Sequence, residues 1–135
     1  MTRQSELRAL VRLTDTVFAA RQATMARIRQ QELLVRDRLA ALDQARTHRA
    51  DALAEAGDSA ADPALAAGAD LLWQAWIERR RAALNMELSR IIVAREAART
   101  AVALSFGRHQ ATGALLSRQI LTDVKTRTRR DDASS

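Results

Sequence analysis

Apolar residues recur along the first half of the chain with alternating spacings of four and three. The pattern runs through Leu7, Val11, Phe18, Met25, Ile28, Val35, Leu39, Leu42 and Leu53. Intervening positions of the same series hold Thr14, Arg21, Glu32, Arg46 and Arg49. A repeat of 3.5 residues kept over more than six heptads is typical of a helix in a left-handed coiled coil.

A second, looser series of the same kind follows residue 70. It contains Trp73, Ile77, Leu84, Leu88, Ile91, Arg95, Ala98, Val102, Leu116 and Ile120. It predicts another long helix with one apolar side.

The residues that interrupt helices, Gly and Pro, occur together between the two series, at residues 57–63. Residues 5–56 contain neither Gly nor Pro, residues 57–63 read GDSAADP, and residues 64–130 contain no Pro. Gly57 suits the left-handed position after a helix, Asp62 suits a cap, and Pro63 suits a first turn. We therefore predict a helix over about 4–56, a loop at 57–62, a helix over about 63–128 and a disordered tail at 129–135.

Two helices of this length joined by a short loop lie antiparallel. The prediction is an all-α, antiparallel two-helix coiled-coil hairpin: one elongated rod and a single domain. Folding at the loop sets Ile28 opposite Ile91, Val35 opposite Leu84, and Leu42 opposite Ile77. The same pairing sets Thr112 beside Leu7 and leaves residues beyond about 118 unpaired. Gly107 and Gly113 weaken that outer part, which we expect to fray unless something binds it.

Charged residues interrupt the series at Arg21, Glu32, Arg46 and Arg49. Long arginine stems can cover an apolar seam while their charged ends stay in water. Alternatively, the interruptions keep the hairpin only moderately stable because it works in contact with a partner. Both interpretations stay open.

Composition agrees with long helices. Hydrophobic residues make up 47% of the 135 residues, aromatic residues only 3%, and there is one Pro. The chain has no Cys, its first residues lack the apolar stretch of a secretory signal, and no window of 18 uncharged apolar residues exists. We expect a soluble cytoplasmic protein.

Charge is sorted along the chain. Residues 1–49 hold ten Arg against five acids, residues 50–78 hold six acids and no Lys or Arg, and residues 79–130 hold twelve basic residues against three acids. In a hairpin the acidic segment forms the loop end, and the two basic segments lie together. We expect a negative tip and a positive body that attracts acidic surfaces.

The segment LLWQAWIERRRAALN carries both tryptophans, Trp73 and Trp76. They fit either packing at the tip or exposure to a partner, and Trp76 with Arg80 could form a cation–π pair one turn apart. The arginines at 79–81 point in different directions around a helix, which weakens the case for a nucleic-acid patch.

Catalytic chemistry is not indicated. His48 and His109 would lie some 55–60 Å apart on the expected hairpin. No Cys supplies a nucleophile, and no glycine-rich loop follows a strand. We expect no enzymatic activity, no metal and no cofactor.

The chain resembles the FliJ/YscO family of the type III export apparatus. The residues that carry the resemblance are LRALVRL in the first helix, RQQELLVRDRLAAL further along it, a short capped loop, and Trp76, Arg79, Arg80, Leu84, Asn85 and Leu88 in the second helix. The resemblance is one of pattern over nearly the whole chain.

The resemblance implies a stalk similar to that of rotary ATPases. The open end would enter the hexameric export ATPase through Arg3, Arg8, Arg12, Arg108, Arg118 and Lys125. The tip, with Trp73, Trp76 and Arg80, would face the export gate protein or export chaperones. It would work in the cytoplasm, with peripheral association at the inner membrane face as a further option, in a flagellar or an injectisome system.

Two other functions fit the same residues. A basic coiled coil binds nucleic acid or an anionic membrane through its shaft. A structural adaptor dimerises through its imperfect seam, so the chain is expected as a monomer or a homodimer.

Overall fold

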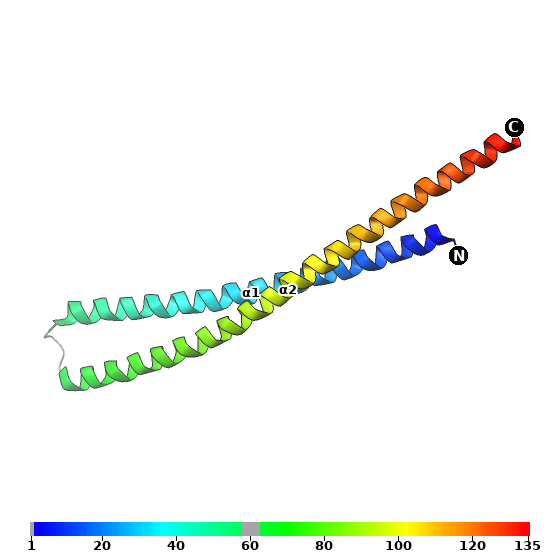
Figure 1. The fold of residues 1–135 in the computed structure, drawn as a ribbon. Helices are drawn as coiled ribbons and strands as arrows, with labels where there is room; N and C mark the ends of the chain where they lie inside the picture. Colours follow the sequence, from blue (N-terminus) through cyan, green and yellow to red (C-terminus); the bar gives the residue numbers. More distant parts are fainter. Residues whose placement is uncertain (1, 58–62) are drawn as a thin grey trace. The chain divides into compact units, whose positions relative to one another are not determined.

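The protein is all-α and folds as a two-helix hairpin. The computed structural model describes residues 2–57 and 63–135. Helix α1 spans Arg3–Ala56 and helix α2 spans Pro63–Ser134. The two helices pack against each other in antiparallel directions, and no strand occurs in the described residues (Figure 1). The predicted fold class is therefore confirmed.

Helix ends follow their local chemistry. The Ser5 backbone N–H donates to Thr2 Oγ1 over 3.1 Å, so Thr2 caps α1. Gly57 has a φ of 50°, the left-handed conformation expected for the residue that closes α1. Pro63 is the first residue of α2, as predicted. The expected cap Asp62 lies outside the described residues.

The structure corrects the predicted end of α2. The helix continues to Ser134, past the boundary expected near 128, and includes residues 129–134 of the predicted tail. No Gly or Pro follows Gly113, so nothing in the backbone stops the helix. Arginine is also a good helix former, which favours helix through Arg129 and Arg130.

The hairpin divides into two compact units. Unit 1 contains the described residues up to Arg27 together with Glu96–Ser135, and unit 2 contains Ile28–Arg95. Each unit is an antiparallel pair of helical segments, one from α1 and one from α2. They are described separately below.

Unit 2 has a core of branched aliphatic side chains. Val35 and Leu84 are only 2% and 1% exposed, and Ile91 completes the buried cluster. Partly buried residues packed against this cluster are Ile28, Leu39, Leu42 and Leu88. Ile77, nearer the loop, is also buried.

Unit 1 buries smaller and more polar side chains. Ala98, Ser105 and Thr112 lie in the buried line of α2. Phe18 of α1 packs against Phe106 of α2, with ring centroids 5.4 Å apart. The apolar contact in this unit therefore depends on a few larger residues, among them Phe18 and Met25.

The pairing of the helices differs from the expected one. Thr112 was expected beside Leu7, but its hydroxyl lies 2.9 Å from that of Thr14, one heptad further along α1. A shift of one heptad turns the same face of each helix toward its partner, so apolar periodicity does not distinguish the two registers. Polar contacts do.

Within unit 2, the contacts of Glu32 distinguish the observed register from the expected one. Its carboxylate is buried and accepts two hydrogen bonds from Arg95 Nη1, the one to Oε2 over 2.9 Å. The expected register would instead have placed Glu32 near Glu87, where two like charges repel each other. The observed pairing thus turns an interruption of the seam into an ion pair.

Three arginines also interrupt the predicted series, and they differ in burial and in ion pairing. Arg21 is exposed and lies outside the seam. Arg46 and Arg49 are partly buried and bind acids of α2: Arg46 pairs with Glu78 over 2.8 Å and Arg49 with Asp70 over 2.9 Å. Their stems cover the seam near the loop while their charges are compensated.

Candidate functional site

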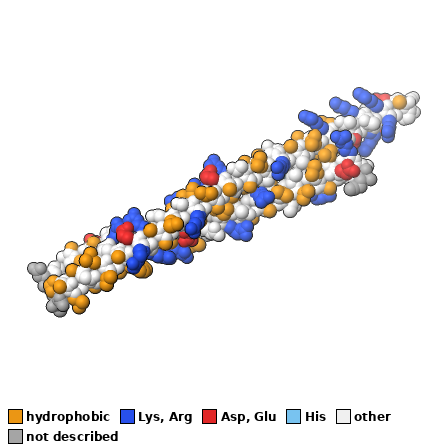
Figure 2. Space-filling view, turned by 60° about the horizontal axis from the view of Figure 1, so that its bottom comes forward, with side chains coloured by type: hydrophobic (Ala, Val, Ile, Leu, Met, Phe, Trp, Pro, Cys, Tyr) orange, Lys and Arg blue, Asp and Glu red, His pale blue; other side chains and the backbone are white. Residues whose placement is uncertain are grey.

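Unit 1 carries the predicted basic residues on its surface. All of them are exposed: Arg3, Arg8 and Arg12 on α1, and Arg108, Arg118 and Lys125 on α2. Figure 2 shows Lys and Arg side chains gathered over the last part of α2. No salt bridge joins these six side chains to an acid among the described residues, so their charges are available to a partner.

Two of these residues share one recess. Arg3 of α1 and Arg118 of α2 line it together with Leu7 and Leu115. The antiparallel pairing places the first turn of α1 beside the Arg118 turn of α2, so both arginines border the same recess. An anionic side chain could be bound there by two arginines at once.

Arg8 is held in a small polar chain. With the Gln4 amide oriented to satisfy its neighbours, Gln4 donates to Asp123 Oδ2 over 2.8 Å and accepts from Arg8 Nη2 over 2.9 Å. This chain ties the start of α1 to α2 through polar groups, and it orients Arg8 without neutralising it.

The end of α2 adds cations that sequence reasoning missed. Every residue from 124 to 134 is exposed, and Lys125 is followed there by Arg127, Arg129 and Arg130. Arg127 and Arg130 line a second recess with Thr2 and Arg3. Only Lys125 of this run was among the predicted site residues; Arg127 lay in the predicted helix without being named, and Arg129 and Arg130 fell in the predicted tail.

Trp73 packs within unit 2, near the loop. The Arg49 guanidinium carbon lies 4.6 Å from the centre of the Trp73 ring, and Arg49 Nε donates to Asp70 Oδ1 over 2.9 Å. Among the described residues this is the cation–π contact of the region, in place of the expected Trp76–Arg80 stack. Trp73 is therefore part of the packing between the helices.

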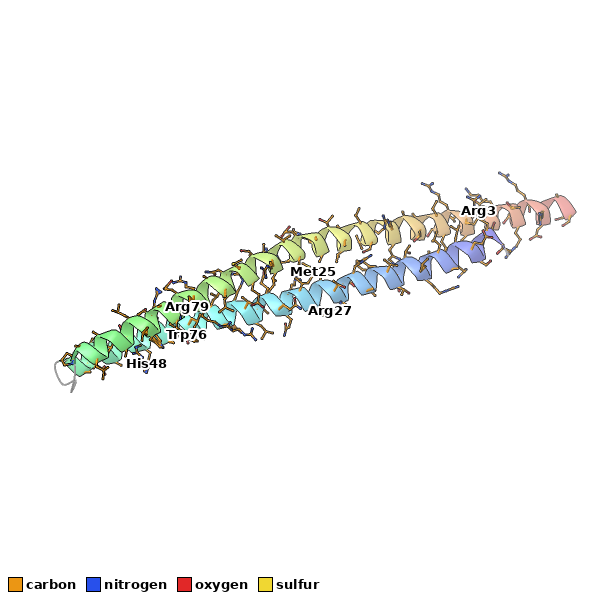
Figure 3. The ribbon with its side chains drawn as sticks, turned by 90° about the horizontal axis from the view of Figure 1, so that it is seen from below. Arg3, Met25, Arg27, His48, Trp76 and Arg79 are labelled. Carbon is orange, nitrogen blue, oxygen red and sulfur yellow. The ribbon has the colours of Figure 1, made fainter. Side chains whose placement is uncertain are left out.

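Trp76 faces outward instead. Its side chain is 50% exposed, and Arg80, one turn later, is exposed as well. Figure 3 labels Trp76 on the part of α2 that runs beside the end of α1. The two interpretations of the tryptophans thus each apply to one residue: Trp73 packs, and Trp76 is available to a partner.

The neighbouring arginines diverge as expected. Arg79 and Arg80 are exposed, while Arg81 turns toward α1 and lies 3.9 Å from Asp43. Three consecutive side chains on a helix cannot share one face. They do not form a single basic patch.

Acidic residues near the loop fall into two groups. Asp70 and Glu78 are neutralised by Arg49 and Arg46. Asp51 and Glu55 are exposed on α1, and no ion pair joins either of them to another described residue. The described part of the tip therefore presents uncompensated negative charge.

A polar layer crosses unit 1 at His109. Thr14 Oγ1 lies 3.2 Å from His109 Nδ1, and His109 Nε2 lies 3.7 Å from Asp15 Oδ1. The imidazole also stacks on Phe18. These contacts satisfy the ring at the helix interface. No group of three or more potential metal ligands occurs in residues 2–57 and 63–135.

Neither described helix contains a stretch long and apolar enough to cross a bilayer. No protein-family model matches the chain, and neither a curated protein nor a solved structure matches it.

Proposed function

We propose that the protein is a non-enzymatic coiled-coil stalk or adaptor of a type III export ATPase complex, flagellar or injectisome. It works in the cytoplasm, at or near the inner membrane face. The basic residues of unit 1 enter the hexameric ATPase ring, and the tip of unit 2 contacts the export gate protein or export chaperones.

One observation carries the proposal: the exposed cations of unit 1 have no acidic partners within the described chain. Charged side chains without internal partners are well suited to bind an acidic surface supplied by another molecule. Unit 1 contains the first part of α1 and the last part of α2, so both helices contribute exposed cations to it (Figure 1).

A pull-down with the hexameric export ATPase tests the proposal. Charge reversal to Glu at Arg8, Arg12, Arg108 and Arg118 should reduce binding at least tenfold, because four attractions become repulsions. These residues are exposed, so the hairpin should still fold; circular dichroism checks this.

A matched control uses four exposed arginines of unit 2, namely Arg29, Arg38, Arg79 and Arg90. Reversing these charges changes the net charge by the same amount. Binding should fall much less than with the unit 1 variant. Equal losses in both variants would show that only net charge matters, and unchanged binding in the unit 1 variant would rule out the ring contact.

Nucleic-acid binding is the second candidate, favoured by the basic run from Lys125 to Arg130. Electrophoretic mobility shift with random duplex DNA over a salt series tests it. Phosphate binding predicts that log K falls by about 0.9 per neutralised phosphate for each unit of log salt. Tight binding with a steep slope would favour this function over the stalk.

A further inference from the structure

Unit 1 carries exposed leucines on one side of its helix pair. Residues separated by whole turns lie on the same side of a helix. By this criterion the side takes two leucines from each helix, namely Leu10 and Leu13 of α1 and Leu104 and Leu115 of α2. They are between 40% and 59% exposed. Four large apolar side chains left in water on one side of a unit indicate a contact surface, the unit 1 leucine strip.

The strip borders a hollow between the two helices. Phe18 and Phe106 pack together on one side of the seam. At about 100° per residue, Leu10 of α1 and Leu115 of α2 project from the other side. The recess that Leu115 lines together with Leu7 lies on that side. Side chains of both helices therefore surround the place where an apolar group of a partner can enter.

Cations border the strip on both helices. Arg3 of α1 and Arg118 of α2 line the recess beside Leu115. Arg108 projects on the same side of α2, since it precedes Leu115 by two turns. All three arginines are exposed, and no ion pair joins any of them to an acid among the described residues. Their charges are available to a ligand of the strip.

Acids are scarce around the strip. The segments that carry it, residues 3–17 and 104–118, contain only Glu6 and Asp15 as acids. Asp15 Oδ1 lies 3.7 Å from His109 Nε2, on the other side of the seam, so Glu6 is the single acid of these segments on the strip's side. Three cations against one acid make the border positive, and it attracts a partner that carries Asp or Glu.

The combination of leucines and arginines selects a helix among acidic partners. A nucleic-acid duplex would bind the arginines through its phosphates but leave the leucines without an apolar contact. A bilayer takes up a protruding apolar face, usually with Trp or Phe, whereas these leucines border a hollow. A second copy of the strip would bring like charges together. An amphipathic helix covers both kinds of side chain, because its apolar anchors recur every three, four or seven residues.

We infer that the unit 1 leucine strip binds an amphipathic helix of a partner protein. The apolar face of that helix covers the leucines, and Asp or Glu residues at its edges pair with Arg3, Arg108 and Arg118, since arginine binds carboxylates through two parallel hydrogen bonds. The inference deepens the proposed function by naming the element that the basic residues of unit 1 meet, and it rests on that proposal for the partner's setting. The surface itself is argued from unit 1 alone.

Fluorescence anisotropy with a labelled peptide tests the inference on the full chain. The probe is a synthetic helix of about 18 residues, with Leu on one face, Glu along both edges of that face and Ala elsewhere. Its anisotropy should rise in a saturable manner as the protein is added. Absence of saturable binding would refute the strip.

Two leucines of unit 1 give a matched pair of variants. Leu13 and Leu121 are 59% and 60% exposed, but Leu121 projects from the outer side of α2, away from the strip. Leu13→Gln should weaken peptide binding roughly tenfold, while Leu121→Gln should leave it within about twofold. Both sites are exposed, so the fold should be retained, which circular dichroism checks. Equal effects of the two substitutions would overturn the strip.

A second matched pair tests the charges. Arg118 and Arg12 are both exposed, but Arg12 projects from α1 on the side away from the strip. Arg118→Gln should weaken peptide binding about fivefold, and Arg12→Gln should change it by less than about twofold. Equal losses would mean that the peptide responds only to net charge, which would contradict a defined site.

Further arms identify the occupant. A peptide with the same residues in scrambled order, and one with Lys in place of Glu, should each bind at least tenfold more weakly. Binding of either peptide as tightly as the original would contradict an acidic amphipathic helix. Anionic vesicles should show no Leu13-dependent binding, and sedimentation should show no Leu13-dependent dimer. A positive result in either arm would assign the strip to lipid or to a second copy and overturn the inference.

The peptide test is independent of the ATPase. If the peptide fails to bind while the ATPase pull-down depends on the unit 1 arginines, the strip is refuted and the stalk stands. If the peptide binds specifically and the pull-down fails, the strip stands without the stalk.

Discussion

Single residues in the seam differ greatly in how much they hold the helices together. Val35, Ile77 and Leu84 are at most 2% exposed, whereas Leu33, Leu34 and Leu104 are each more than half exposed. Leucine content therefore says little about stability; position in the heptad decides which leucines matter. Arg49 also matters, because it contacts both Trp73 and Asp70 and so packs and pairs at once.

Truncation of a buried leucine should show the difference directly. Leu84→Ala removes the most buried side chain of the unit 2 core and should lower the free energy of unfolding by about 2–4 kcal/mol. Leu104→Ala, at a site 57% exposed, should change it by less than about 0.5 kcal/mol. Urea denaturation followed by circular dichroism measures both, and similar losses would contradict the assigned seam.

Replacing a glycine within a helix should raise stability instead of lowering it. Gly107 lies within α2, and a methyl group added there would meet no atom within 4 Å. Gly107→Ala should stabilise the helix by about 1 kcal/mol through its better helix propensity.

Gly57 serves as the contrasting site because its φ is 50°. Gly57→Ala should destabilise by about 1 kcal/mol, since a side chain is strained in the left-handed conformation. Thermal denaturation should therefore show midpoints displaced in opposite directions. A lower midpoint for Gly107→Ala would mean that this turn of α2 is not helical in solution.

At the scale of the helices, polar residues select the register. Apolar side chains occupy the same faces in two registers one heptad apart, so burial alone leaves the choice open. Glu32 with Arg95, and Thr14 with Thr112, meet in the observed register. A polar group in the seam that is satisfied in only one alignment is a known means of specifying it.

Paired cysteines can report the register, because the chain has none of its own. Thr14→Cys with Thr112→Cys should form a disulfide rapidly, whereas Thr14→Cys with Ser105→Cys, which suits the register shifted by a heptad, should not. Replacing Glu32 and Arg95 by Leu should allow the second pair to form as well. Gel mobility under oxidising conditions reads out the result.

If the second pair forms equally well in the chain that retains Glu32 and Arg95, the polar pair does not set the register. If it fails to form even after both are replaced by Leu, other contacts fix the alignment.

The final part of α2 lacks lateral support. Residues 124–134 are exposed throughout, and isolated helical segments of this length are marginal in water. Hydrogen exchange should give these amides protection factors below about ten. Addition of the export ATPase should raise their protection if the basic run enters the ring.

Rapid exchange that the ATPase leaves unchanged would place the ring contact elsewhere on unit 1. High protection without the ATPase would mean that another part of the assembly, such as a second chain, already covers the segment.

The hairpin was predictable because its signals are local. Spacing gave the seam, and Gly57 and Pro63 gave the break. The register was not predictable from apolar matching, because a heptad pattern shifted by seven residues matches itself. It was also not predictable that Trp73 packs while Trp76 is exposed. The packing of Trp73 depends on Arg49, which is distant in sequence and contacts Trp73 only when the two helices pair.

At the scale of the whole chain, the two units differ in the charges that they expose. Unit 1 exposes cations without acidic partners, while unit 2 exposes both cations, such as Arg79 and Arg90, and the unpaired acids Asp51 and Glu55. Such sorting suits a protein that meets chemically different partners through different parts of its chain.

The proposed function predicts that salt weakens binding to the export ATPase. Exposed charges are screened as the Debye length falls from about 13 Å toward 6 Å between about 0.05 and 0.3 M salt. The dissociation constant should rise on the order of tenfold over this range. Isothermal titration calorimetry measures it; a value that does not depend on salt would point to an apolar contact instead.

The small and hydroxyl-bearing residues Ala98, Ser105 and Thr112 in the buried line of unit 1 also bear on how the protein is degraded. They make fewer dispersion contacts than the Val, Leu and Ile side chains of unit 2, so segments near both termini should open more often. A protease at low concentration would then trim the chain from its two ends. Mass spectrometry should find a fragment close to residues 28–95 as the longest-lived product.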